Sequence, residues 1–108
     1  MNMTLREMCS ELDVTRRAVQ GYEKIGLVSA SSRTDRGHLL YDEVARERIE
    51  KIKRYQDFGF SVKEVKAVID APNEVLKKAL EIKLEKLKED RKKQDVLIKK
   101  AQELLETL

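Results

Sequence analysis

Cysteine, proline, glycine and tryptophan are all scarce in this sequence of 108 residues, which has one cysteine, one proline, four glycines and no tryptophan. A single cysteine, Cys9, excludes an internal disulfide. The four dispersed glycines provide no glycine-rich loop for a nucleotide phosphate. The sequence also contains no apolar run that resembles a signal peptide or a membrane span of about 20 residues. We therefore expect a cytoplasmic protein with no membrane partner.

Side chains that carry catalytic or metal-binding chemistry are equally sparse. No histidine or cysteine follows His38, so the clustered soft ligands of a metal site are lacking. Cys9 falls on the apolar face of a predicted helix and is expected to be a buried structural residue, and His38 is expected to be a surface or strand residue rather than a ligand. No nucleophile stands beside a base, and no paired carboxylates occur outside ordinary amphipathic helices. We expect no enzyme activity, no cofactor and no bound metal.

Charged residues are abundant, at 40% of the sequence, but 23 basic residues are nearly balanced by 20 acidic residues, and the net charge is only +3. The overall charge therefore does not indicate a nucleic-acid partner, and any DNA-binding surface has to come from a local arrangement of basic side chains. The length is that of a single domain. The hydrophobic fraction of 41% is enough for a small core that a partner subunit would help to cover.

Two short helices are predicted near the start of the chain. Thr4 followed by Glu7 is a capping box for a helix over residues 5 to 12. After a tight connection, Thr15 is suited to cap a second helix, which Gly26 is suited to end in a left-handed conformation. This order predicts a helix-turn-helix, the arrangement in which the second helix enters the DNA major groove.

A hairpin is predicted after these helices. Leu27 and Val28 form one expected strand, residues 29 to 37 form a polar loop, and residues 39 to 41 form the second strand. Gly37 can adopt the positive φ of a turn. We interpret these segments as a small two-stranded wing beside the helix-turn-helix.

Two more helices are predicted before the only proline. Asp42 is expected to cap a helix that runs to about residue 57 and has a buried stripe formed by Ala45, Ile49, Ile52 and Tyr55. Ser61 and Glu64 form a second capping box and start a short helix that the proline terminates. We place the end of a DNA-binding domain, residues 1–72, at this proline.

Residues 73–108 are predicted to form one long helix, because they contain no glycine or proline and are rich in leucine, lysine, glutamate and alanine. Spacings of four and three residues define a seam that sustains about four heptads. The seam consists of Leu80, Leu84, Leu87, Arg91, Gln94, Ile98, Ala101, Leu105 and Leu108. Too little protein remains to cover it, so we expect a second copy to do so in a coiled-coil homodimer. The alternative is that the helix folds back on its own N-terminal domain.

The direction of the two helices in the dimer can be argued from the polar members of the seam. Arg91 and Gln94 lie near its middle, where antiparallel packing sets them against their own copies. This favours an antiparallel coiled coil. Such a coil places the two N-terminal domains at opposite ends, where they can address successive major grooves about 34 to 36 Å apart in a pseudo-palindromic site.

Candidate DNA contacts lie mostly in the second helix and the wing. Thr15, Arg16 and Arg17 stand at the start of that helix, where they suit phosphates and guanine edges, and the alternative is an ordinary solvated helix start. Tyr22 is either a core residue or a phosphate contact. Arginines of the wing loop and a lysine at the start of the fourth helix are weaker backbone candidates. The full candidate set is Thr15, Arg16, Arg17, Gln20, Tyr22, Arg33, Arg36, His38 and Lys63.

Four segments resemble motifs of the MerR family of bacterial transcription regulators. They are TLREM at residues 4 to 8, YEKIGL at 22 to 27, GHLLY at 37 to 41 and GFSVKEV at 59 to 65. The resemblance covers roughly residues 3 to 70, and the predicted helix at its end looks like the family's dimerisation helix. It implies a mainly α-helical protein, a winged helix-turn-helix dimer joined by an antiparallel coiled coil. It also implies that the dimer bends and untwists promoter DNA for RNA polymerase.

The resemblance also implies which residues contact DNA and where the chain departs from its family. The wing falls on residues 33 to 40, and the implied recognition-helix contacts are Thr15, Arg16, Arg17 and Tyr22. Gln20 and Gly21 stand where a second arginine and a second aromatic residue are usual. His38 and Leu39 stand where tyrosine and arginine are usual. Two customary phosphate contacts are therefore missing, and we expect lower affinity or an altered operator preference.

Two other functions remain open at the level of the sequence. One is an excisionase-like protein that bends DNA, although such proteins usually lack a long dimerisation helix. The other is a coiled-coil module for protein interaction in which DNA binding has decayed through Gln20, Gly21 and Leu39. Drug-responsive members of the family carry a ligand-binding domain after the coil, which has no counterpart before Leu108. We expect either a minimal regulator or a chain cut before an effector domain.

Overall fold

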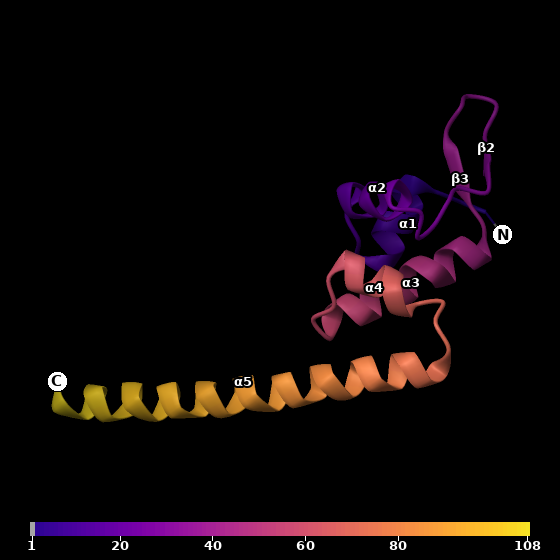
Figure 1. Ribbon diagram of the computed structural model, residues 1–108. Coiled ribbons are helices and arrows are strands. Elements are labelled where there is room, and N and C mark those ends of the chain that lie inside the picture. Colours follow the sequence, from indigo (N-terminus) through magenta and orange to yellow (C-terminus); the bar gives the residue numbers. More distant parts are fainter. Residues whose placement is uncertain (1) are drawn as a thin grey trace. The chain divides into compact units, whose positions relative to one another are not determined.

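The computed structural model describes residues 2–108 and divides into two compact units, Met1–Asp70 and Ala71–Leu108. Within the described residues, the first unit contains β1 (Met3–Thr4), α1 (Leu5–Leu12), α2 (Arg16–Lys24), β2 (Ser32–Arg33), β3 (Leu39–Tyr41), α3 (Glu43–Asp57) and α4 (Val62–Val68) (Figure 1). The second unit contains α5 (Asn73–Thr107). The predicted mainly α-helical fold is confirmed.

The first two helices begin at the predicted caps. At α1, the Glu7 N–H donates to Thr4 Oγ1 at 3.2 Å and the Thr4 N–H donates to Glu7 Oε1 at 3.1 Å, which is the reciprocal capping box. At α2, the Ala18 N–H donates to Thr15 Oγ1 at 3.0 Å. These local bonds satisfy N–H groups that have no partner inside the helix. The helix-turn-helix prediction is confirmed.

The segment after α2 differs from the prediction. Gly26, at φ 83°, ends the helix, and the Leu27 N–H donates back to Tyr22 O at 2.9 Å. This bond belongs to a helix-terminating turn, so Leu27 is part of the end of α2 rather than of a strand. Leu27 and Val28 are both buried in the core. The strand expected at these two residues is therefore wrong, and the first strand of the wing is β2, Ser32–Arg33.

The sheet has a third strand that the sequence analysis did not predict. β3 is central, and β2 pairs with it in antiparallel register, with Arg33 opposite Leu39. β1 pairs with the other edge of β3, with Met3 opposite Tyr41. A strand of two residues carries no alternating pattern, so only its pairing with β3 reveals it.

The core of the first unit forms around α3. Asp42 caps this helix, with its Oδ1 accepting from the Ala45 N–H at 2.9 Å. The predicted stripe is buried and consists of Ala45, Ile49, Ile52 and Tyr55. α4 starts at the predicted capping box but ends at Val68, before the proline. The prediction that Pro72 terminates this helix is therefore wrong, and Pro72 stands instead at the N-cap position of α5.

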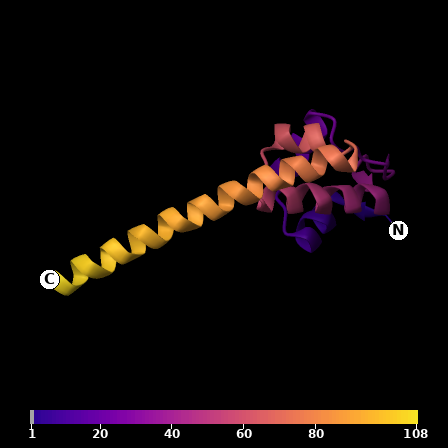
Figure 2. The same cartoon turned by 60° about the horizontal axis from the view of Figure 1, so that its bottom comes forward.

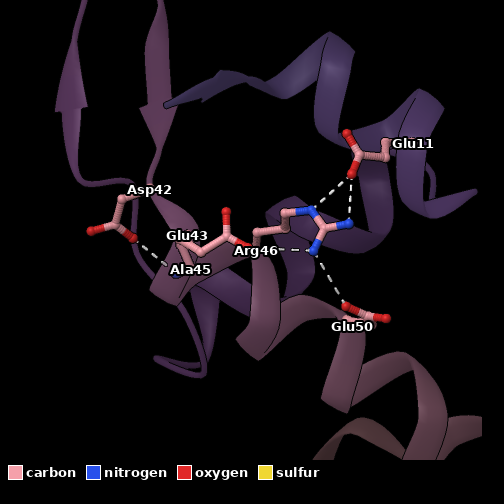
Figure 3. Close-up of polar contacts among 6 residues, drawn as sticks. All are labelled: Glu11, Asp42, Glu43, Ala45, Arg46 and Glu50. Atoms are coloured by element: carbon pink, nitrogen blue, oxygen red, sulfur yellow. Dashed lines mark hydrogen bonds and ion pairs between the residues drawn. The ribbon is translucent and has the colours of Figure 1, made fainter. Parts of the chain in front are cut away.

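An ionic cluster around Arg46 joins α3 to α1 (Figure 3). The Nε and Nη2 atoms of Arg46 donate to Glu11 Oε1 at 2.9 and 2.5 Å, and Nη1 lies 3.6 Å from a carboxylate oxygen of Glu43 and 3.6 Å from one of Glu50. The carboxylates are solvent-accessible, so each pair contributes little free energy by itself. Their joint effect is to hold the first helix of the helix-turn-helix against α3.

We expect two carboxylates of the first unit to make its stability fall in acid. The N–H of Ala45 holds the pKa of Asp42 below its ordinary value, and the hydrogen bond from Arg48 does the same to the pKa of Asp70. A pKa that is lower in the folded state adds stability that is present above the unfolded value, and this stability is lost as pH falls below about 4. We expect Asp42→Asn, which keeps the cap but cannot titrate, to match the wild-type melting temperature near pH 7 and to lose less of it at pH 3. Thermal melts from pH 7 to pH 2.5 measure this. An equal loss of melting temperature at low pH in the two proteins would contradict it.

α5 is a continuous helix (Figure 2), which confirms the predicted long helix. It buries none of its residues. The exposed large apolar side chains include five members of the predicted seam, Leu84, Leu87, Ile98, Leu105 and Leu108. Exposed apolar surface of this extent is typical of a protein interface. Across residues 2–108, no helix has the length and apolarity that crossing a bilayer requires.

Candidate nucleic-acid interface

The helix α2 has one buried side and one exposed side. Val19 and Tyr22 face the core, with 0% and 3% of their surface exposed. The other side is exposed and carries four predicted contacts, Thr15, Arg16, Arg17 and Gln20. No carboxylate among residues 2–108 forms an ion pair with either arginine. Their guanidinium groups are therefore available to a phosphate or a base edge, as in a recognition helix.

The wing is a tight hairpin that projects beyond α1 and α2 (Figure 1). The Thr34 N–H donates to His38 O and the Gly37 N–H donates to Thr34 O, both at 2.8 Å. Gly37 takes the positive φ that this turn needs, at 82°. Arg33 Nη1 donates to Gly37 O at 3.1 Å, which fixes this guanidinium along the hairpin. Arg36 is exposed in the turn itself.

A groove of about 610 Å³ lies between the start of α1, the start of α2 and the wing. We call it the arginine groove, and its lining residues are Thr4, Leu5, Arg6, Arg16, Arg33, Gly37, His38 and Leu39. It therefore brings together three of the predicted contacts, Arg16, Arg33 and His38. No aspartate or glutamate is among its lining residues, so all of its charged side chains are cationic.

Arg6 belongs to the arginine groove although the sequence analysis did not select it. The sequence did contain a signal for it, because a basic residue in the first turn of a helix interacts unfavourably with the helix dipole. An arginine at such a position is therefore a candidate for a binding role. The other predicted contacts do not line the groove. Arg17 and Gln20 are exposed on α2, Arg36 lies in the wing turn, and Lys63 lies exposed in the first turn of α4.

Two buried tyrosines attach α2 to the rest of the first unit. The Tyr22 hydroxyl donates to Gln56 Oε1 of α3 at 2.6 Å, and burial raises the pKa of this phenol. The Tyr41 hydroxyl of β3 donates to the Glu23 carboxylate, and burial together with this bond raises the pKa of Tyr41. Of the two roles considered for Tyr22, the structure supports the core residue. Sequence reasoning did not select Glu23, Tyr41 or Gln56, because each bond joins segments far apart in the chain.

This placement gives a direct test of the role of Tyr22. We expect Tyr22→Phe to lower the free energy of unfolding by about 1 kcal/mol, because it removes one internal hydrogen bond and leaves Gln56 without that donor. We also expect it to leave DNA affinity and its salt dependence unchanged. Denaturant unfolding and a DNA titration at two salt concentrations measure both quantities. A loss of affinity without a loss of stability would instead identify Tyr22 as a phosphate contact.

Cationic side chains of α3 and α4 hold the C-terminal end of α2. Lys66 Nζ donates to Ile25 O at 2.6 Å, and Arg48 Nε donates to Leu27 O at 2.9 Å. Arg48 also forms two hydrogen bonds of 2.6 Å with the carboxylate of Asp70. Positive groups at the carbonyl end of a helix are favourable because they complement its dipole. The direction of α2 is therefore set by side chains outside the helix-turn-helix.

The possible metal ligands, Cys9 and Gly21 form no further site among residues 2–108. Among residues 2–108, no three histidine, cysteine, aspartate or glutamate side chains are grouped closely enough to hold a metal ion. Cys9 was expected to be buried but is only partly so. A Cβ added at Gly21 would meet nothing within 4 Å, so packing does not require the glycine that replaces the usual aromatic residue.

Comparisons with known proteins agree with this architecture. The model of the MerR HTH family of regulatory proteins matches residues 3–72. The HTH-type transcriptional activator mta of Bacillus subtilis is 30% identical over 98 residues, which is 91% of this chain and 38% of that protein. The crystal structure of MtaN, the N-terminus of the Bacillus subtilis multidrug transporter activator, superposes with a TM-score of 0.76 at 28% identity, covering 95% of this chain and 97% of that one.

A more distant structure shares the fold alone. HiNmlR, a MerR family regulator that lacks the sensor domain and was crystallised with promoter DNA, superposes with a TM-score of 0.66 at 15% identity, over 86% of this chain and 77% of that one. The chain spans only 27% to 38% of the length of the first curated relatives that it matches. The matched family model covers the helix-turn-helix, the wing and α4. The chain therefore belongs to the MerR family of helix-turn-helix regulatory proteins.

Proposed function

We propose that this protein is a sequence-specific DNA-binding transcription regulator of the MerR type. It binds a pseudo-palindromic promoter site as a homodimer and distorts the DNA to control transcription by RNA polymerase. The partners are double-stranded promoter DNA and a second copy of the chain, and no enzyme activity or cofactor is involved. A promoter target implies a cytoplasmic location.

The observation that carries this proposal is the shared surface of α2 and the wing. Arg16 and Arg17 are exposed at the start of α2 and form no ion pair with residues 2–108. Arg33 donates to Gly37 O on the hairpin and lines the arginine groove together with Arg16. Because the net charge of the chain is only +3, this gathering of cations is a local feature rather than a consequence of composition. A helix start and a hairpin that present arginines side by side fit a major groove and the adjacent backbone.

The dimer is supported by the apolar side chains of α5. Its 35 residues correspond to about 50 Å at 1.5 Å per residue, which is long enough to separate two DNA-binding units by one helical turn of DNA. The related mta is described as a transcriptional activator, and HiNmlR was crystallised with promoter DNA. Both descriptions support a promoter-binding role for this chain.

Nuclease footprinting tests the proposal. Purified protein is added to the DNA upstream of its own gene at low and moderate salt, with random genomic fragments as a second substrate. We expect protection of a two-fold symmetric site that is lost as the salt concentration rises, because phosphate contacts release counterions. Absence of protection on both substrates at low salt would refute DNA binding.

Two alternative functions make different predictions in the same experiments. An excisionase-like bending protein would bind DNA without forming a stable dimer in its absence, and the 35-residue α5 does not favour this alternative. A protein-interaction module with decayed DNA binding would be a dimer that protects no DNA. Gln20, Gly21 and Leu39, which replace customary family residues, are the features that favour this second alternative.

A further inference from the structure

We infer that the arginine groove holds one backbone phosphate of DNA, and that Arg6 of α1 is a contact to that phosphate together with Arg16 and Arg33. This inference rests on the proposed function, since it names the ligand of one part of the interface. It adds the first helix to an interface that the sequence analysis assigned to the second helix, the wing and the start of α4.

The charge of the groove points to an anionic ligand. Three arginines from three separate elements, α1, α2 and β2, line a single groove, and no aspartate or glutamate is among the lining residues. No carboxylate among residues 2–108 forms an ion pair with Arg6, Arg16 or Arg33. Like charges that converge without a counter-charge repel one another, and a bound anion removes that repulsion.

The position of Arg6 on α1 supports the same ligand. Arg6 lies in the first turn, where the helix dipole disfavours a cation. The carboxylate of Glu7 accepts a hydrogen bond from the Thr4 N–H, and Glu7 does not line the groove. Glu7 therefore does not balance the positive charge of Arg6 within the groove. A phosphate in the groove would interact favourably with the guanidinium and with the positive end of α1 at the same time.

The remaining walls of the groove suit a nucleic-acid backbone. Its lining includes the apolar residues Leu5 and Leu39 and the polar residues Thr4 and His38. A sugar–phosphate backbone presents the same alternation of carbon-rich and anionic groups. Arginine is the side chain whose planar fork fits phosphate oxygens with two parallel hydrogen bonds. The groove also lies between the recognition helix and the wing, so DNA held by both would pass over it.

Methylphosphonate scanning tests the inference, because it neutralises one phosphate at a time in an operator identified by footprinting. For the wild type, we expect one phosphate in each half-site whose neutralisation weakens binding about tenfold. We expect Arg6→Gln to weaken binding to unmodified DNA by a similar factor and to reduce the slope of log affinity against log salt by about one unit per protomer. In this variant, neutralising that same phosphate should weaken binding by a smaller factor than in the wild type, because only the contacts of Arg16 and Arg33 remain to be lost.

Arg54→Gln is the matched control, since Arg54 is an exposed arginine of α3 outside the groove. It should retain the wild-type affinity, salt slope and methylphosphonate pattern. Arg6→Gln with wild-type affinity and slope would overturn the inference while leaving the proposed function intact. A weakened Arg6→Gln variant that loses as much affinity as the wild type at every neutralised phosphate would also overturn it, because Arg6 would then act only on the structure of the protein. A wild type that binds no DNA would overturn both the inference and the proposed function.

Discussion

Replacing Arg16 and Arg17 together by glutamine is expected to abolish sequence-specific DNA binding without unfolding the protein. Both side chains are exposed and form no ion pair with the described residues, so their removal leaves no buried group without a partner. A bidentate arginine contact to a base contributes about 1–3 kcal/mol of discrimination. A lost phosphate contact lowers the salt slope by about one unit. Both losses occur twice in a dimer, and we therefore expect affinity to fall by at least about 100-fold.

The double variant Lys92→Gln/Lys93→Gln is the matched control, because it removes two adjacent cations from exposed positions of α5 outside the seam. It should bind the operator as the wild type does. Circular dichroism melts of all three proteins verify that folding is unaffected, and titrations at two salt concentrations give the slopes. If the double variant Arg16→Gln/Arg17→Gln keeps the wild-type affinity, the two arginines at the start of α2 do not contact DNA.

Leu87→Asp is expected to convert the dimer into monomers. Leu87 belongs to the predicted seam and has 47% of its surface exposed in the single chain, so it is not a core residue there. In the proposed coiled coil, the same position is covered by the second copy, and an unpaired carboxylate buried there costs several kcal/mol. The cost applies to both copies. Because each half-site would then be bound independently, the variant should also lose most of its affinity for a two-fold symmetric site.

Val96→Asp is a close control for this substitution. Val96 is apolar, lies on the same helix with 52% of its surface exposed, and is not a member of the seam. Sedimentation at micromolar concentration should therefore show a dimer for the wild type and for Val96→Asp, and a monomer for Leu87→Asp. A monomeric wild type would contradict the proposed dimer, and a dimeric Leu87→Asp would place the dimer interface elsewhere on the molecule.

Local features of the fold were predictable because the determining interactions join residues close in the chain. The capping bonds at Thr4, Thr15 and Ser61 each span three residues. The stripe on α3 follows from the helical period, and the length of α5 follows from the absence of glycine and proline. The arginines at the start of α2 were recognisable for the same reason, since a cap and the residues after it lie next to each other in the sequence.

The tertiary structure alone decided the features that depend on distant segments. Met3 becomes part of a strand only because β3 offers an edge. Tyr22 is a core residue because Gln56, 34 positions later, accepts its hydroxyl hydrogen bond. Arg6, Arg16 and Arg33 share one groove because α1, α2 and the wing fold together. Residue spacing along the chain encodes helical periods and caps, whereas the meeting of separate elements depends on packing around a common core. The sequence therefore determined the elements, and the tertiary structure brought together the residues of the proposed DNA-binding surface.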